Sequence, residues 1–147
     1  MPLHQDLLNL ARELVSRNPA APIEADLRRG VSTAYYALFH LLVHEATTRL
    51  VVPVTIRPRV AGSFDHRVMR VVCQEYAKVK PNAAEFVALQ QARYQADYEI
   101  AATITQAQAD TDVMRAELAF LDWAAVQADP SAATLLAELL CRGIPKR

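Results

Sequence analysis

A helical hydrophobic period runs through almost the whole sequence and limits the fold more than any other feature. The helix-forming residues Ala, Leu, Gln, Glu and Arg dominate, and only three of the 147 residues are glycine. Hydrophobic residues make up 52% of the chain, enough to bury the core of one domain. We therefore predict a single all-α domain over 1–147. Its expected architecture is an antiparallel bundle of four to five main helices plus a short C-terminal helix.

Prolines and glycines divide this pattern into segments. Two prolines within 18–22 end the first helix, and the two prolines and glycine of 51–62 predict a loop or an extended connection. Ser63 or Asp65 is the expected N-cap of the third helix. Residues 99–103 either separate or join the fourth and fifth helices. The predicted helices cover 3–17, 23–50, about 63–79, 82–99, a segment that ends near 128, and 131–142, which stops at Gly143.

Apolar residues at helical spacing predict which face of each helix lies in the core. The expected core stripes are Leu3, Leu7, Leu10 and Leu14; then Leu27, Val31, Ala34, Leu38 and Leu41; then Val68, Val72, Tyr76 and Val79; and finally Ile104, Ala107, Thr111, Met114, Leu118, Leu121 and Ala125. On the third helix, four polar residues are expected to face water: Arg67, Arg70, Gln74 and Lys78.

The formal net charge is zero, which argues against a polybasic nucleic-acid coat protein or membrane binder. The charge is nevertheless uneven, because 1–80 holds eleven Lys/Arg against seven Asp/Glu and 81–147 holds five against nine. The sequence shows neither a signal peptide nor an apolar run long enough to span a membrane. Its two cysteines, Cys73 and Cys141, are expected to be reduced core residues. These features favour a cytoplasmic protein.

Polar and aromatic residues follow one face of the second predicted helix beside its apolar stripe. They are Arg29, Thr33, Tyr36, His40 and His44, at spacings of 4, 3, 4 and 4. Two interpretations remain open. In one, Tyr36 and His40 are buried amphipathic residues satisfied by neighbouring helices, and in the other they line a polar groove in the bundle or at a subunit interface.

A basic cluster follows that helix. Arg57, Arg59, Arg67 and Arg70 lie within fourteen residues that include a single acid, Asp65, and a histidine, His66. A histidine near a helix N-terminus has its charged form disfavoured, so its neutral imidazole is available as a general base. Arginines beside it are suited to hold a phosphate. The alternative interpretation is a solvated basic surface without a ligand.

Other chemistries have little support in the sequence. It contains no Gly-rich phosphate loop, HExxH, GxSxG or EF-hand motif. His40 and His44 lie four residues apart, but no carboxylate occupies an obvious third ligand position, since Glu45 points elsewhere. We therefore predict neither a metal site nor a cofactor.

The run from Leu27 to Leu42, LRRGVSTAYYALFHLL, resembles the signature helix of HEPN domains (higher eukaryotes and prokaryotes nucleotide-binding), in the bacterial subgroup with Tyr-Tyr-Ala-x-Phe-His. The run from Arg93 to Glu99, RYQADYE, resembles a second element of that family, and His66 lies where many relatives have a histidine. The resemblance covers roughly 5–128.

This resemblance implies an all-α bundle that usually forms a homodimer. Many HEPN proteins are metal-independent ribonucleases, often toxins paired with a nucleotidyltransferase antitoxin. Their active motif is an arginine separated from a histidine by four to six residues, and Arg59 and His66 are separated by six. In that chemistry the 2′-OH of the RNA attacks the adjacent phosphate, His66 transfers the proton and Arg59 stabilises the phosphoryl oxygens.

Three hypotheses about function follow. The first is a HEPN-like module that binds a nucleotide, RNA or a partner protein, with candidate binding residues Arg29, Tyr36, His40, Arg57, Arg67 and Arg70. The second is an active metal-independent endoribonuclease with Arg59 and His66 as its catalytic residues. The third is a non-catalytic helical dimer that scaffolds a nucleotidyltransferase-type partner.

Overall fold

The longest helix, α2 (Glu24–Leu50), forms the centre of the fold in the computed structural model, which describes residues 1–77 and 81–142. Its buried residues occupy most of its circumference, so neighbouring helices can cover it from several sides. It packs against α1, α3, α5, α6 and α7. The predicted core stripe from Leu27 to Leu41 is buried, as expected.

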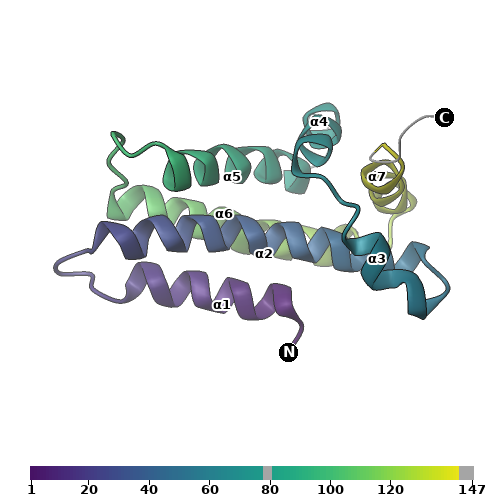
Figure 1. The fold of residues 1–147 in the computed structure, drawn as a ribbon, viewed down its shortest axis with the longest axis horizontal. Coiled ribbons are helices and arrows are strands. Elements are labelled where there is room, and N and C mark those ends of the chain that lie inside the picture. The colour runs from purple at the N-terminus through teal and green to yellow at the C-terminus, as the bar shows by residue number, and fades with distance from the viewer. Residues whose placement is uncertain (78–80, 143–147) are drawn as a thin grey trace.

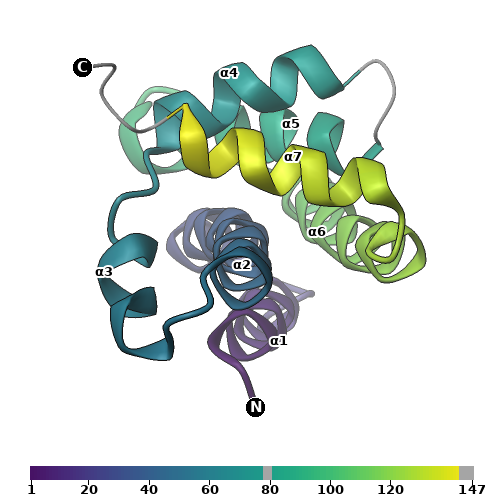
Figure 2. The same ribbon diagram turned by 90° about the vertical axis from the view of Figure 1, so that its right-hand side faces the viewer.

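Four helices run side by side as an up-and-down bundle: α1, α2, α5 and α6 (Figure 1). Two more, α4 and α7, cross one end of it, where they pack against each other (Figure 2). The remaining elements are a 3-10 turn, η1, and a five-residue helix, α3. The bounds are α1 (Leu3–Ser16), η1 (Val54–Ile56), α3 (Arg57–Ala61), α4 (His66–Tyr76), α5 (Pro81–Tyr98), α6 (Gln106–Val126) and α7 (Pro130–Cys141). All regular structure in the described ranges is helical, which confirms the all-α prediction.

The helix ends follow the expected local chemistry. Asp65 caps α4, because its carboxylate accepts a hydrogen bond from the Val68 N–H at 3.0 Å. Residues 99–105 separate α5 from α6, which settles the alternative that the sequence left open. The predicted loop over 51–62 is in fact partly helical, since η1 and α3 lie within it. The predicted stop at Gly143 lies outside the described residues.

Small residues decide how closely α1 approaches α2. Gly30 faces α1, and a Cβ added there would overlap Val15 Cγ1 and lie 3.4 Å from the Ala11 carbonyl oxygen. The residues of α1 that are buried are Leu8, Ala11 and Val15. The predicted leucine stripe of α1 is therefore wrong, with Leu3 and Leu10 exposed and Leu7 and Leu14 only partly buried.

The predicted core stripe of α6 is also wrong, apart from Ile104, which precedes the helix and is buried. The other six members of that stripe, from Ala107 to Ala125, are exposed. The face that packs into the bundle consists of Ala109, Val113, Ala116, Ala119 and Trp123. Alanines let the α6 backbone lie close to its neighbours, so close packing places this face inside although the opposite face carries Met114, Leu118 and Leu121.

The inward face of α4 is centred on Met69, Val72 and Cys73, with Val68 and Tyr76 partly buried beside it. Arg67, Arg70 and Gln74 are exposed as predicted, whereas Val79 and Lys78 lie outside the described residues. Cys73 is buried as expected, but Cys141 is exposed, because it ends α7 on the outer side of that helix. Within the described ranges, none of the helices has both the length and the apolar content needed to cross a bilayer.

Candidate functional site

The first residue of α4, His66, contacts three aromatic side chains of α2. The Tyr35 hydroxyl and the His66 Nδ1 atom are hydrogen-bonded at 2.6 Å, and the Phe39 and His66 ring centroids lie 4.2 Å apart. The Tyr36 ring meets the imidazole edge-on at 5.8 Å. From α5, the side chain of Gln90 donates a hydrogen bond to the His66 carbonyl at 2.8 Å. Residues of α2 thus hold the imidazole ring, and Gln90 of α5 holds the backbone of the same residue.

Arg93 of α5 brings a positive charge to the same place. Its guanidinium carbon lies 5.2, 5.7 and 5.8 Å from the ring centroids of Tyr35, Tyr36 and Tyr98. Its side chain is only 13% exposed, and one terminal N–H donates to the Tyr36 hydroxyl at 3.4 Å. The buried Nε atom has no hydrogen-bond partner among the described residues. The chain therefore leaves this permanent cation incompletely hydrogen-bonded, and an acceptor from outside can approach it only through the 13% of the side chain that stays exposed.

A carboxylate balances part of this charge. Asp97, one turn further along α5, lies 3.8 Å from the Arg93 guanidinium and accepts a hydrogen bond from Ser32 at 3.0 Å. We call the group formed by His66, Arg93, Tyr35, Tyr36, Phe39 and Asp97 the His66–Arg93 cluster.

The surroundings of His66 favour its neutral form. Burial lowers the pKa of His66, and the nearby positive charge of Arg93 lowers it further, while Asp65 acts in the opposite direction. Burial also raises the pKa of Tyr35 above its ordinary value, so its hydroxyl keeps its proton. A neutral imidazole with Nδ1 bonded to Tyr35 has Nε2 left to accept or donate a proton.

Within the described ranges, the predicted catalytic residues Arg59 and His66 make no hydrogen bond with each other, and Arg59 is not one of the groups that shift the pKa of His66. Arg59 lies on α3 with its side chain exposed. Among the described residues, the charged groups that act on His66 are Arg93, Asp65 and His40. The arginine beside His66 is therefore Arg93.

Arg57, one of the predicted binding residues, has a structural role. Its Nε donates to the Val51 carbonyl at 2.8 Å, and a terminal N–H donates to the Thr48 carbonyl at 3.2 Å. These carbonyls belong to the C-terminal end of α2, which a cation stabilises.

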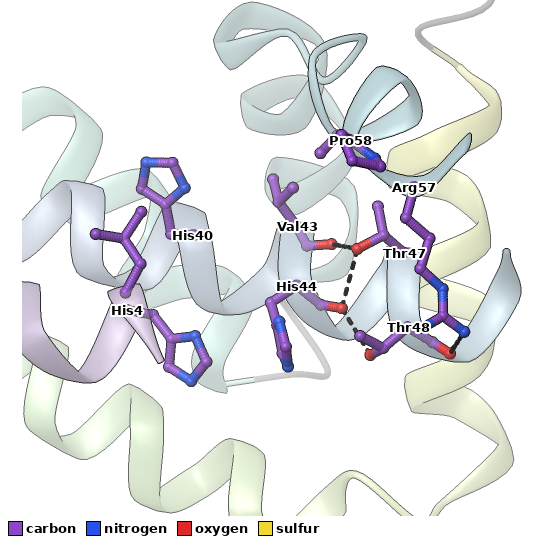
Figure 3. A pocket seen from close by; sticks show the side chains of 10 residues that line it. His4, His40, Val43, His44, Thr47, Thr48, Arg57 and Pro58 are labelled. Atoms are coloured by element: carbon purple, nitrogen blue, oxygen red, sulfur yellow. Dashed lines mark hydrogen bonds between the residues drawn. The ribbon is translucent and has the colours of Figure 1, made fainter. Parts of the chain in front are cut away.

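Arg57 also borders a half-open pocket of about 310 Å³, which we call the His4–His44 pocket (Figure 3). The His4 and His44 ring centroids lie 5.1 Å apart, while the His40 ring points away from them. Burial is the main cause that lowers the pKa of both His4 and His40. The lining residues are Leu3, His4, His40, Val43, His44, Thr47, Thr48, Arg57, Pro58 and Ala61.

The remaining predicted binding residues lie around the His66–Arg93 cluster. Tyr36 belongs to it, and the exposed Arg29 lines a hollow together with Asp97 and Tyr98. The exposed Arg70 lines another hollow with Tyr94. Arg67 is exposed on α4.

Two of these neighbours, Tyr94 and Tyr98, form an exposed aromatic pair on α5. Their ring centroids lie 5.2 Å apart, and the residues are 56% and 61% exposed. They extend the aromatic surface of the cluster from the buried Arg93 out to solvent.

Arg93, Asp97 and Tyr35 are site residues that the sequence pattern alone did not assign. Arg93 and Asp97 lie four residues apart in the run that resembles the second family element, so that run was the available signal. Arg93 comes close to His66 only because α5 packs beside α4 and α2. In the described part of the chain, no three His, Cys, Asp or Glu side chains are arranged to hold a metal ion.

Comparison with protein-family models, curated proteins and solved structures found no match for this chain.

Proposed function

We propose that this chain is a HEPN-like module that binds RNA or a nucleotide through phosphate at the His66–Arg93 cluster. The observation that carries the proposal is the buried guanidinium of Arg93, whose Nε is unsatisfied, held beside a neutral histidine. A guanidinium is always charged and presents its donors in a planar fork that matches phosphate oxygens. The rings of Tyr35, Tyr36 and Tyr98 hold it in place, so little side-chain entropy is lost when an anion binds.

The exposed residues around the cluster fit a single-stranded ligand. Arg29, in the hollow that Asp97 and Tyr98 also line, and Arg70, in the hollow that Tyr94 lines, add positive charge to the exposed surface of these hollows. Tyr94 and Tyr98 present rings on which bases can stack, the usual means by which proteins hold single strands without reading their sequence.

A binding experiment tests this proposal directly. The affinity of the purified protein is measured by fluorescence anisotropy for a labelled single-stranded RNA and for an abasic ribose-phosphate strand of the same length. Phosphate recognition predicts binding of both strands, and stacking predicts tighter binding of the strand that carries bases, by about 1–3 kcal/mol per stacked base. The variant Tyr94→Ala/Tyr98→Ala is expected to bind both strands equally. If neither strand binds the wild-type protein, the proposal fails.

A second candidate function is metal-independent cleavage of RNA. The observation that favours it is the orientation of His66, whose Nδ1 is fixed by Tyr35 while Nε2 remains for proton transfer. His66 would take the proton of the ribose 2′-OH, which attacks the adjacent phosphorus and displaces the 5′-oxygen of the next nucleotide. The leaving 5′-oxygen takes a proton from water and His66 releases its own proton to solvent, so the products are a cyclic phosphate and a free 5′-hydroxyl. Arg93 is placed to stabilise charge on the phosphoryl oxygens.

Cleavage in EDTA tests this candidate and identifies the arginine that takes part. The proteins compared are the wild type and the variants His66→Ala, Arg93→Ala and Arg59→Ala. The geometry predicts loss of cleavage in the first two variants, whereas the motif spacing predicts loss in Arg59→Ala. Cleavage that survives His66→Ala would exclude this candidate.

The family resemblance adds three further parts to the proposal: a cytoplasmic location, a toxin-like role and a nucleotidyltransferase-type antitoxin or scaffolded partner. Growth of cells that express this chain tests the toxin-like role. Growth inhibition that requires His66 supports the toxin-like role. Normal growth of cells, together with RNA binding by the purified protein, supports an RNA-binding function without a toxin-like role.

A further inference from the structure

One stripe of α6 points away from the bundle and carries a methionine and two leucines, whereas the buried face holds three alanines, Val113 and Trp123. Met114, Leu118 and Leu121 at its centre are 56%, 48% and 67% exposed. The stripe, which we call the α6 stripe, consists of Ala107, Thr111, Met114, Leu118, Leu121 and Ala125, all of them exposed. The spacings along it are 4, 3, 4, 3 and 4, the a and d pattern of a seam between two helices.

Neighbouring helices border the α6 stripe without covering it. On one side Glu117 pairs with Arg12 of α1, and on the other Arg115 pairs with Glu85 of α5 at 3.2 Å. In Figure 2, α6 lies at one edge of the bundle. An apolar patch that is continuous and has a polar rim is typical of a protein–protein interface.

We propose that the α6 stripe packs against the α6 stripe of a second copy of this chain, with the two helices antiparallel. In a register centred between Leu118 and Leu121, Leu118 of each copy faces Leu121 of the other copy. The next layer sets Met114 against Ala125, so a long side chain meets a short one. The pairing is two-fold symmetric, so one surface serves both copies and the assembly closes as a dimer.

The charges beside the stripe select this register. In an antiparallel pair, residues on one flank face the same flank of the second copy, so Arg115 lies opposite Asp122 twice across the interface. Asp122 has no ion-pair partner in the described residues. A register shifted by one heptad sets Arg115 against Arg115 and Glu117 against Glu117, which is repulsive. A parallel pair sets Glu117 against Asp122, which is also repulsive.

This inference stands independently of the proposed function, because the α6 stripe is on a different helix from the His66–Arg93 cluster and its test needs no RNA. The association state of the wild-type protein is measured by analytical ultracentrifugation across a wide concentration range, beside Leu118→Glu/Leu121→Glu. We expect a dimer whose dissociation constant rises about 100-fold or more in the variant. Leu10→Glu is the matched control, since Leu10 is an exposed leucine of α1 and is expected to leave the dimer unchanged.

Asp122→Arg tests the orientation with an effect of opposite sign in the two arrangements. It places two arginines together in the antiparallel dimer and weakens it, whereas in a parallel dimer it faces Glu117 and strengthens it. Circular dichroism checks that each variant keeps the wild-type helix content, which is expected because the substituted side chains lie outside the core. A wild-type protein that stays monomeric, or a dimer that persists in Leu118→Glu/Leu121→Glu, overturns the proposal. Strengthening by Asp122→Arg overturns its antiparallel form.

Discussion

Two sites beside α2 each combine histidine with an arginine, and the two arginines differ in what their guanidinium groups contact. In the His66–Arg93 cluster, Arg93 lies against aromatic rings and its buried Nε is unsatisfied. In the His4–His44 pocket, Arg57 donates to the carbonyls of Val51 and Thr48. Arg57 therefore stabilises the end of a helix, whereas Arg93 is the group through which we propose that a ligand binds. The comparison teaches that a cation is a candidate binding group only when the backbone around it leaves its donors unused.

The strongest test of this difference is Arg93→Gln. We expect it to weaken RNA binding by about 2 kcal/mol, roughly 30-fold, because a charge-assisted contact to phosphate is lost. Fluorescence anisotropy measures the loss. Arg93→Lys keeps the charge without the planar fork and is expected to restore only part of the affinity.

A thermal melt of Arg93→Gln separates lost binding from lost folding. If folded Arg93→Gln bound RNA as tightly as the wild type, Arg93 would not be the ligand-binding arginine, and it would no longer differ from Arg57 in this respect.

The corresponding change in the other group is Arg57→Gln. We expect the free energy of unfolding to fall by about 1–2 kcal/mol, because two backbone carbonyls at the end of α2 lose a charged donor. Urea denaturation measures this fall. RNA affinity is expected to stay within about twofold of the wild type, as for other residues that make no ligand contact. A large loss of affinity with unchanged stability would place the ligand in the His4–His44 pocket instead.

Acidification is expected to act on both groups. Burial lowers the pKa of His66, His40 and His4 in the folded state, so the unfolded chain binds more protons near its ordinary histidine pKa of about 6.5. The free energy of unfolding should therefore fall as the pH drops from above 7 toward 5.5. Asp112 acts in the opposite direction, because burial raises its pKa to about 6 and its protonation stabilises the folded state.

Denaturation at several pH values, in an Asp112→Asn background, measures the histidine contribution alone. His66→Gln and His4→Gln should each reduce the change of the unfolding free energy with pH. The size of each reduction gives the contribution of that histidine. A flat profile in the Asp112→Asn background would contradict the prediction.

The smallest expected effect is that of Arg67→Gln. Arg67 is exposed on α4, where its charge is screened by salt, so we expect a loss of RNA affinity of about twofold at low salt and none at high salt. Arg17→Gln on α1 is the matched control for net charge. A loss as large as that of Arg93→Gln would mean that surface charge, and not the buried guanidinium, dominates binding.

The fold could be predicted from the sequence where the pattern of residues allows only one buried face or one helix cap. The core stripe of α2 is buried because apolar residues surround that helix, and the Asp65 cap follows from local chemistry alone. On α1 and α6 two faces compete, one with leucines and one with alanines. Hydropathy favours the leucines, but close packing against α2 favours the alanines, and a single sequence does not rank these effects.

The candidate site was partly predictable for a similar reason. His66, Tyr36 and the run that contains Arg93 were all identified as features of interest. The choice of Arg59 as the partner of His66 followed from the arginine–histidine motif that the family resemblance implies. Arg93 reaches His66 because α5 packs beside α2 and α4, and such a contact between distant segments leaves no local pattern.

The crossing of α4 and α7 at one end of the bundle has a consequence. Arg142, just after α7, pairs with Glu75 of α4 at 2.8 Å and with Glu138 of its own helix. The helix that begins with His66 is thus linked at its other end to the residue that follows α7. Replacement of Arg142 would break both ion pairs and with them the polar link between α7 and the C-terminal end of α4.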